Sequence, residues 1–236
     1  MENIKNKKAL RHEYKQKKKA LKLEYKDILK VFRDTVSGFT HMGGGVLAII
    51  GAVFLCIKSD SVGTLVSYLI FGISMFLLFG ASTTYHLVTK NSVIKAFHKL
   101  DHAMIYVLIA GTYTPLIYRA FSGSVQFWFM FGIWAFTLLG VIFKLFFTGR
   151  FRIVSTLLYI IMGWACVFSM KTVSAVLGTG GVMWLISGGL FYTIGGVIYA
   201  LKWPGKNKEH FGFHEIFHIF VLLGAISLYF TIYLYL

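Results

Sequence analysis

The stretch Phe211–Leu236 reads FGFHEIFHIFVLLGAISLYFTIYLYL and joins two patterns. It contains H-E-x-x-H (His214, Glu215 and His218), which on a soluble helix is typical of a zinc metalloprotease. After His218 it has no charged residue, and the apolar run is long enough to cross a bilayer, which takes about 20 residues. We therefore expect a transmembrane helix that carries two histidines on one face near its start.

The rest of the chain is equally apolar. Of its 236 residues 57% are hydrophobic and only 14% are charged, whereas about 25% charged residues is usual for a soluble domain. Seven apolar runs of near-spanning length follow one another, at residues 39–57, 63–87, 103–121, 125–147, 153–170, 182–201 and 213–236. We predict an all-α polytopic membrane protein, a bundle of seven transmembrane helices with short links. Cys56 and Cys166 fall inside these runs and are interpreted as small core residues.

The charged residues are concentrated at the N-terminus. Residues 1–34 hold twelve of the 24 Lys and Arg residues and five of the nine acids. We therefore divide the chain into a basic cytoplasmic tail, 1–35, and a transmembrane domain, 36–236, and expect no cleavable signal peptide because the tail has no apolar core.

The tail has apolar residues at helical spacing: Leu10, Tyr14, Leu21, Tyr25, Ile28 and Phe32. It is either an amphipathic helix on anionic inner-leaflet headgroups or a solvated leader whose charges only set topology.

The distribution of basic residues predicts the orientation. With the N-terminus in the cytoplasm, the inside segments hold 21 Lys and Arg residues and the outside segments only three, Lys58, Arg119 and Lys171. Basic residues stay cytoplasmic, so this split predicts a cytoplasmic N-terminus and an external C-terminus.

Polar groups inside the runs are costly and usually have a function or a partner. The predicted topology places His86, Asp101, His214 and His218 at a similar depth near the inner face, with Ser82 one turn from His86. Three imidazoles and a water form an open tetrahedral zinc site, as catalysis requires. Asp101 would hydrogen-bond that water and accept its proton. Ser82 would support His86 or bind substrate.

Other interpretations remain open at this point. Interfacial histidines often only hydrogen-bond a neighbouring helix, and His98 and His102 form a second i, i+4 pair that could build a rival site with Asp101. The protease interpretation is weak, because no Asp, Glu or His follows His218 to serve as a third ligand. Glu215 is better explained as a cap in the first helical turn, where the helix dipole favours an acid.

Four motifs in order resemble the hemolysin III family, bacterial relatives of the adiponectin and progestin receptors. They are SxxxH (Ser82 and His86), KLDH with Asp101, AGTYTP at 110–115 and HEIFH at 214–218. The resemblance covers about residue 35 to the end. It implies a seven-helix membrane fold in which His86, His214 and His218 bind zinc, Asp101 holds a water and Ser82 assists. It also implies the cytoplasmic membrane of a bacterium.

Two functions compete on this basis. The resemblance groups the chain with membrane hydrolases of lipid amides such as ceramide, which suggests a zinc-dependent hydrolase of a lipid-like amide or ester. The alternative is a non-enzymatic cytolysin or modulator of membrane state with structural zinc, since the bacterial branch is named for cytolysis. Membrane lipid and a zinc ion are the expected partners, and nucleic acid is not. A retinal receptor is excluded because 213–236 contains no lysine.

Overall fold

The described part of the chain is entirely helical. The computed structural model describes residues 2–88, 90–148, 150–205 and 211–236, with the side chains of 14–18, 21 and 36 onward in the first helix. Within these ranges the elements are α1 (Glu2–Lys58), α2 (Val62–Leu87), α3 (Asn91–Ala120), α4 (Gly123–Phe147), α5 (Arg152–Gly163), the 3₁₀ segment η1 (Ala165–Ser169), α6 (Met170–Leu201) and α7 (Phe213–Tyr235).

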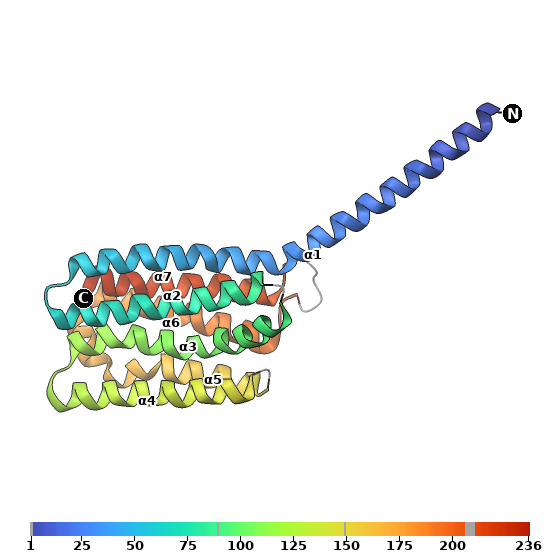
Figure 1. The fold of residues 1–236 in the computed structure, drawn as a ribbon. Coiled ribbons are helices and arrows are strands. Elements are labelled where there is room, and N and C mark those ends of the chain that lie inside the picture. Colours follow the sequence, from blue (N-terminus) through green and yellow to red (C-terminus); the bar gives the residue numbers. More distant parts are fainter. Residues whose placement is uncertain (1, 89, 149, 206–210) are drawn as a thin grey trace.

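In the part of the chain that the structure describes, the helices make seven crossings of the bundle. Six helical stretches are long and apolar enough to span a membrane, because Arg152–Leu201 counts as one run of 50 residues. That run is interrupted at Gly178, whose φ of 61° and ψ of −177° are not helical. Such a backbone conformation is open essentially to glycine alone. The run therefore divides into two crossings, 152–177 and 179–201, which with α1, α2, α3, α4 and α7 make seven within the described residues. Figure 1 shows these helices side by side in one bundle.

Because the number of crossings is odd, the first and last helices begin and end at opposite ends of the bundle. The N-terminal part of α1 projects beyond one end of the bundle, and the C-terminus lies at the other (Figure 1). The structure confirms the predicted all-helical fold. Which end faces the cytoplasm stays a prediction from the charge distribution, as does the division into tail and body at residue 35.

Two of the predicted spans have a wrong boundary at one end. The third helix begins at Asn91 and not at 103. The prediction started too late because the first turns carry Lys95, His98 and Lys99 and are therefore not part of an apolar run. The fifth crossing continues to 177 and not to 170, because the chain stays helical through η1 up to Gly178. The runs predicted at 63–87, 125–147 and 213–236 agree closely with α2, α4 and α7.

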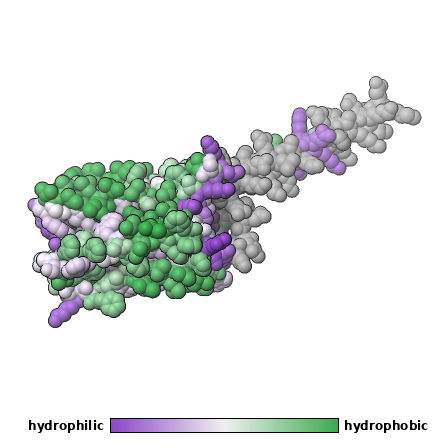
Figure 2. Space-filling model, turned by 60° about the horizontal axis from the view of Figure 1, so that its bottom comes forward, coloured by the Kyte–Doolittle hydropathy of each residue, from purple (hydrophilic) through white to green (hydrophobic). Residues whose placement is uncertain are grey.

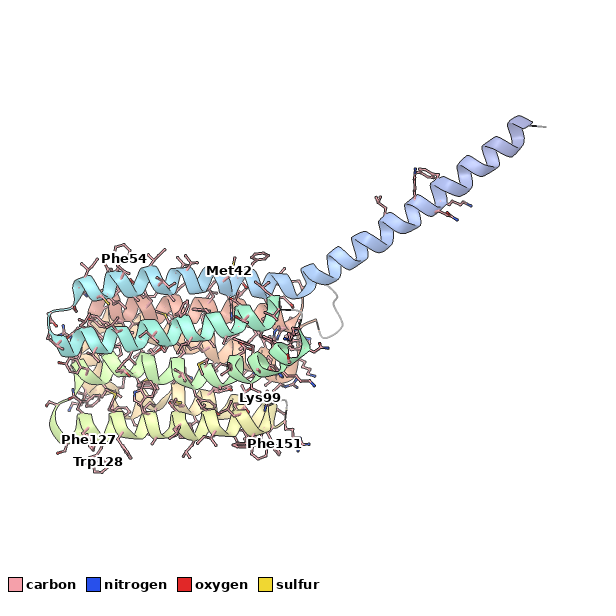
Figure 3. The ribbon with its side chains drawn as sticks, in the orientation of Figure 1. Met42, Phe54, Lys99, Phe127, Trp128 and Phe151 are labelled. Carbon is pink, nitrogen blue, oxygen red and sulfur yellow. The ribbon has the colours of Figure 1, made fainter. Side chains whose placement is uncertain are left out.

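The flank of the bundle is hydrophobic. Figure 2 shows hydrophobic side chains covering much of the visible flank, with hydrophilic residues gathered toward the ends. Large apolar residues such as Phe54, Phe127 and Trp128 point outward and are more than half exposed (Figure 3). A soluble monomer rarely exposes an apolar surface of this extent, so the flank is suited to lipid. In the tail, Tyr14 and Leu21 are also exposed.

Close packing of α6 against α7 depends on glycine. A Cβ atom at Gly188 would lie 2.7 Å from Leu228 Cγ, and one at Gly195 would lie 2.8 Å from Phe220 Cβ. Side chains at these positions would push the helices apart. These glycines therefore serve a close contact between two helices of the same chain.

Hydrogen bonds connect α2, α3, the α1–α2 link and the C-terminal residue at the end of the bundle opposite the N-terminal extension. Arg119 of α3 donates to the Asp60 carboxylate at 2.8 Å and to the carbonyl oxygen of Leu236. The Thr64 hydroxyl of α2 also donates to Asp60. That hydrogen bond, followed by the Arg119 guanidinium, holds the pKa of the Asp60 carboxyl below its usual value.

Candidate metal centre

Three helices deliver the histidines of the candidate site. His86 lies in the last turn of α2, one turn beyond Ser82. His214 and His218 lie in the first turns of α7, four residues apart and therefore on one helix face. α1 packs against both α2 and α7 and brings His41 to the same place. The start of α7 is fixed by Glu215, whose carboxylate accepts a hydrogen bond from the Gly212 backbone N–H at 2.8 Å. The predicted capping role of Glu215 is thus confirmed.

The three histidines predicted as ligands meet in space. His214 Nε2 lies 3.1 Å from His218 Nε2 and 3.4 Å from His86 Nε2. One ring nitrogen from each can be chosen so that all lie within 4.8 Å of one another. Nitrogens that each lie about 2.0–2.1 Å from a tetrahedral zinc ion are roughly 3.3–3.4 Å apart. The donor set therefore fits a metal ion such as zinc.

Asp101 and Ser82 lie beside this histidine set, not within it. Asp101 is buried in α3, about three helical turns after the start of that helix at Asn91. The histidine set that can hold a metal does not include it. The Ser82 hydroxyl is fully buried beside the Asp101 carboxyl, yet makes no hydrogen bond with good geometry to any described residue.

The rival site at His98 and His102 does not form among the described residues. His102 Nδ1–H donates to the His98 carbonyl oxygen at 2.9 Å, and His102 Nε2 lies 2.9 Å from the Tyr199 hydroxyl. The Tyr159 hydroxyl donates to the His102 carbonyl oxygen. Both ring nitrogens of His102 are therefore used by the protein itself. His98 stacks its ring on Tyr85, with the centroids 5.0 Å apart.

His41 is a site residue that sequence reasoning missed. Its side chain is 2% exposed, and its Nε2 lies 2.7 Å from His218 Nδ1. His41 lies near the start of the first predicted run, 39–57, and was not among the residues predicted to form the site. Nothing in the spacing paired it with His218, because the contact joins residues that lie far apart in the chain.

An apolar cavity adjoins the histidines. It has a volume of about 130 Å³ and extends between α3, α5, α6 and α7, and its lining includes Asp101, His214 and His218. Most of the remaining lining is aliphatic or aromatic, with Ile105, Leu116 and Leu185 among it. The arrangement places the polar site at the wall of a space suited to a hydrocarbon chain.

Two basic residues also line this cavity. Lys144 is one of the 21 basic residues assigned to the inside segments. It lies in α4, is 2% exposed and places its Nζ 5.8 Å from the centre of the Tyr159 ring. Arg152 begins α5, donates to the Ala200 carbonyl oxygen and lies over the Tyr199 ring. Sequence reasoning missed the burial of Lys144, since one cation near a span end is usually solvated.

Hydrophobic helices long enough to span a membrane, with a partly buried histidine cluster at one end, define the chain as a multi-pass membrane protein that could hold a metal ion. It belongs to the haemolysin III family: the family model described as Haemolysin-III related matches residues 29–229.

Relatives from bacteria and from mammals cover most of the chain. It is 37% identical to the hemolysin-3 homolog of Bacillus subtilis (strain 168), over 86% of this chain and 93% of that protein. It is 36% identical to hemolysin-3 of Bacillus cereus, over 87% and 92%. Monocyte to macrophage differentiation factor of Homo sapiens is 29% identical, over 84% and 82%. No solved structure gives a significant match.

Proposed function

We propose that this protein is a zinc-dependent membrane hydrolase of a lipid-like amide or ester. The observation that supports this best is the convergence of three imidazole donors, all within 4.8 Å of one another, beside an apolar cavity that His214 and His218 line. His86, His214 and His218 are the proposed ligands. Zinc bound there would activate a water molecule and polarise a carbonyl group.

The chain's own residues divide the remaining tasks. Asp101, close to the histidine set but outside it, holds the attacking water and accepts its proton. Ser82, whose buried hydroxyl lies beside the Asp101 carboxyl, hydrogen-bonds that water or the substrate. The apolar cavity holds the acyl chain and keeps bulk water away from the reacting carbonyl.

The predicted orientation gives this reaction a location. With the N-terminus inside, the histidines face the inner leaflet of a bacterial cytoplasmic membrane, and substrate enters from the bilayer. The basic tail then lies where anionic headgroups are found, and each Lys or Arg near such a surface contributes about 1 kcal/mol of attraction.

The test is hydrolysis by purified protein in lipid nanodiscs. Wild type should cleave a lipid amide or ester, with ceramide as the first substrate. His218→Ala should reduce cleavage to the uncatalysed background. His98→Ala is the matched control, since His98 lies outside the histidine set, and it should stay close to wild type. Full activity in metal-free protein would contradict the proposal.

A non-enzymatic membrane-active role is the second candidate, favoured by the hemolysin-3 names of the bacterial relatives. In that case zinc would be structural and Asp101 dispensable. Dye release from liposomes separates the two. Release by Asp101→Ala protein at the wild-type rate would favour membrane damage without hydrolysis, and absence of release by wild type would count against it.

A further inference from the structure

We infer that His41 is a positioning residue for His218: its ring accepts a hydrogen bond from His218 Nδ1–H and so keeps His218 Nε2 turned toward the other two histidines. The geometry that suggests this is a chain of ring nitrogens. His41 Nε2 lies 2.7 Å from His218 Nδ1, and His218 Nε2 lies 3.1 Å from His214 Nε2. This inference rests on the proposed metal site.

The two nitrogens of His218 have different surroundings. A neutral imidazole carries one proton, and only the nitrogen without it can bind a metal. Which nitrogen keeps the proton is set by the hydrogen bond that the other side of the ring makes. Because Nε2 of His218 faces His214, the proton belongs on Nδ1, where His41 Nε2 is close enough to accept it.

Burial makes this acceptor necessary. His218 is 1% exposed and His41 2%, so water does not readily replace a missing partner of the Nδ1–H group. An unpaired N–H in such a place is unfavourable, and the ring would gain by turning or by moving its proton to Nε2. Either change removes the lone pair that the metal needs.

His41 is itself held firmly. It belongs to α1 and contacts His218 of α7, and its ring is edge-on to Phe79 of α2 at a centroid distance of 5.1 Å. Its ring centroid is 4.0 Å from that of His218. A small shift of α1 would therefore reach the candidate metal centre through this contact.

A purely structural role would be packing between helices, and two substitutions separate the roles. His41→Gln can present an amide oxygen near the position of Nε2 and so keeps an acceptor. His41→Phe keeps a ring of similar size and loses the acceptor. His98→Gln is the control, because His98 does not belong to the histidine set.

The first readout does not need metal. Nitrogen-15 spectra of histidine-labelled, chelator-treated protein report which nitrogen of His218 is protonated, and the His218 signal is assigned by its loss in His218→Gln. Wild type, His41→Gln and His98→Gln should show His218 with the proton on Nδ1. His41→Phe should show a mixture or the Nε2–H form.

The second readout is zinc affinity by competition with a chelator. His41→Phe should bind zinc about 10–100-fold more weakly than wild type, as is usual when the partner of a metal-binding histidine is removed. His41→Gln should restore most of the loss. Equal spectra and equal affinity in His41→Phe and wild type would overturn the inference.

The two readouts also separate this inference from the proposed function. If wild type binds no zinc, the metal site fails while the spectra still decide the role of His41. If His41→Phe does not fold, the wild-type spectrum decides alone, since an Nε2–H form of His218 in wild type contradicts the inference.

Discussion

At the scale of single residues, the proposed metal ligands and the proposed proton acceptor are different residues. Three imidazoles bring donor nitrogens within 4.8 Å of one another, and Asp101, which lines the adjoining cavity, does not belong to that set. A carboxylate in this position can move a proton without occupying the metal. Ligand binding and proton transfer should therefore respond differently to substitution.

Asp101→Asn tests this division. The amide keeps the size of the side chain and removes its ability to accept a proton, so hydrolysis should fall by about 10²–10⁴-fold, the usual contribution of a general base. Zinc content should stay at the wild-type value. Both are measured on the same preparation, and loss of zinc in Asp101→Asn would place Asp101 among the ligands instead.

Local spacing and the charge distribution predicted part of the site. The i, i+4 spacing placed His214 and His218 on one face, and topology placed His86 at the same depth. Contacts between helices could not be predicted from the sequence, because the pairing of His41 with His218 depends on how α1 packs against α7. The contact of His102 Nε2 with the Tyr199 hydroxyl depends on the packing of α6 in the same way.

At the scale of elements, Gly178 determines the number of crossings. The helical run from Arg152 to Leu201 would be far too long for one span, and the non-helical backbone at Gly178 divides it. The sequence predicted two spans here, but the stretch from 171 to 181 appeared to be a link. Its residues are helical on both sides of a single glycine, and hydropathy alone does not locate such a turn.

Gly178→Ala should destabilise the protein. A Cβ atom is strained at φ 61°, ψ −177°, and backbones of this kind cost about 1–3 kcal/mol. Gly132→Ala is the control, since Gly132 lies inside α4 and an added Cβ would meet nothing within 4 Å. The thermal unfolding midpoint in detergent should fall for Gly178→Ala and hold or rise slightly for Gly132→Ala. Equal midpoints would show that the turn tolerates a side chain.

At the scale of the whole molecule, seven crossings and the basic residues together define an orientation. The fold separates the N-terminal extension from the C-terminus (Figure 1), and the charge distribution predicts which end is cytoplasmic. The histidine cluster lies at the end of the bundle where the basic tail begins. The predicted orientation therefore decides which leaflet supplies the substrate.

Cysteine labelling of intact cells tests the orientation at the two ends of α3. In a background with Cys56 and Cys166 replaced by alanine, Ser122→Cys and Asn91→Cys each add one exposed thiol. A membrane-impermeant maleimide should label Ser122→Cys and leave Asn91→Cys unlabelled until the cells are opened. The reverse result would place the histidines at the outer face.

The central claim is that His86, His214 and His218 hold one metal ion. Metal analysis of detergent-purified protein tests it most directly, with His86→Ala as the variant and His98→Ala as the matched control. The account predicts about one zinc ion per chain in wild type and in His98→Ala, and almost none in His86→Ala, since removing one of three protein ligands leaves too few to hold zinc firmly. Wild type without metal, or His86→Ala with the same zinc content as wild type, would contradict it.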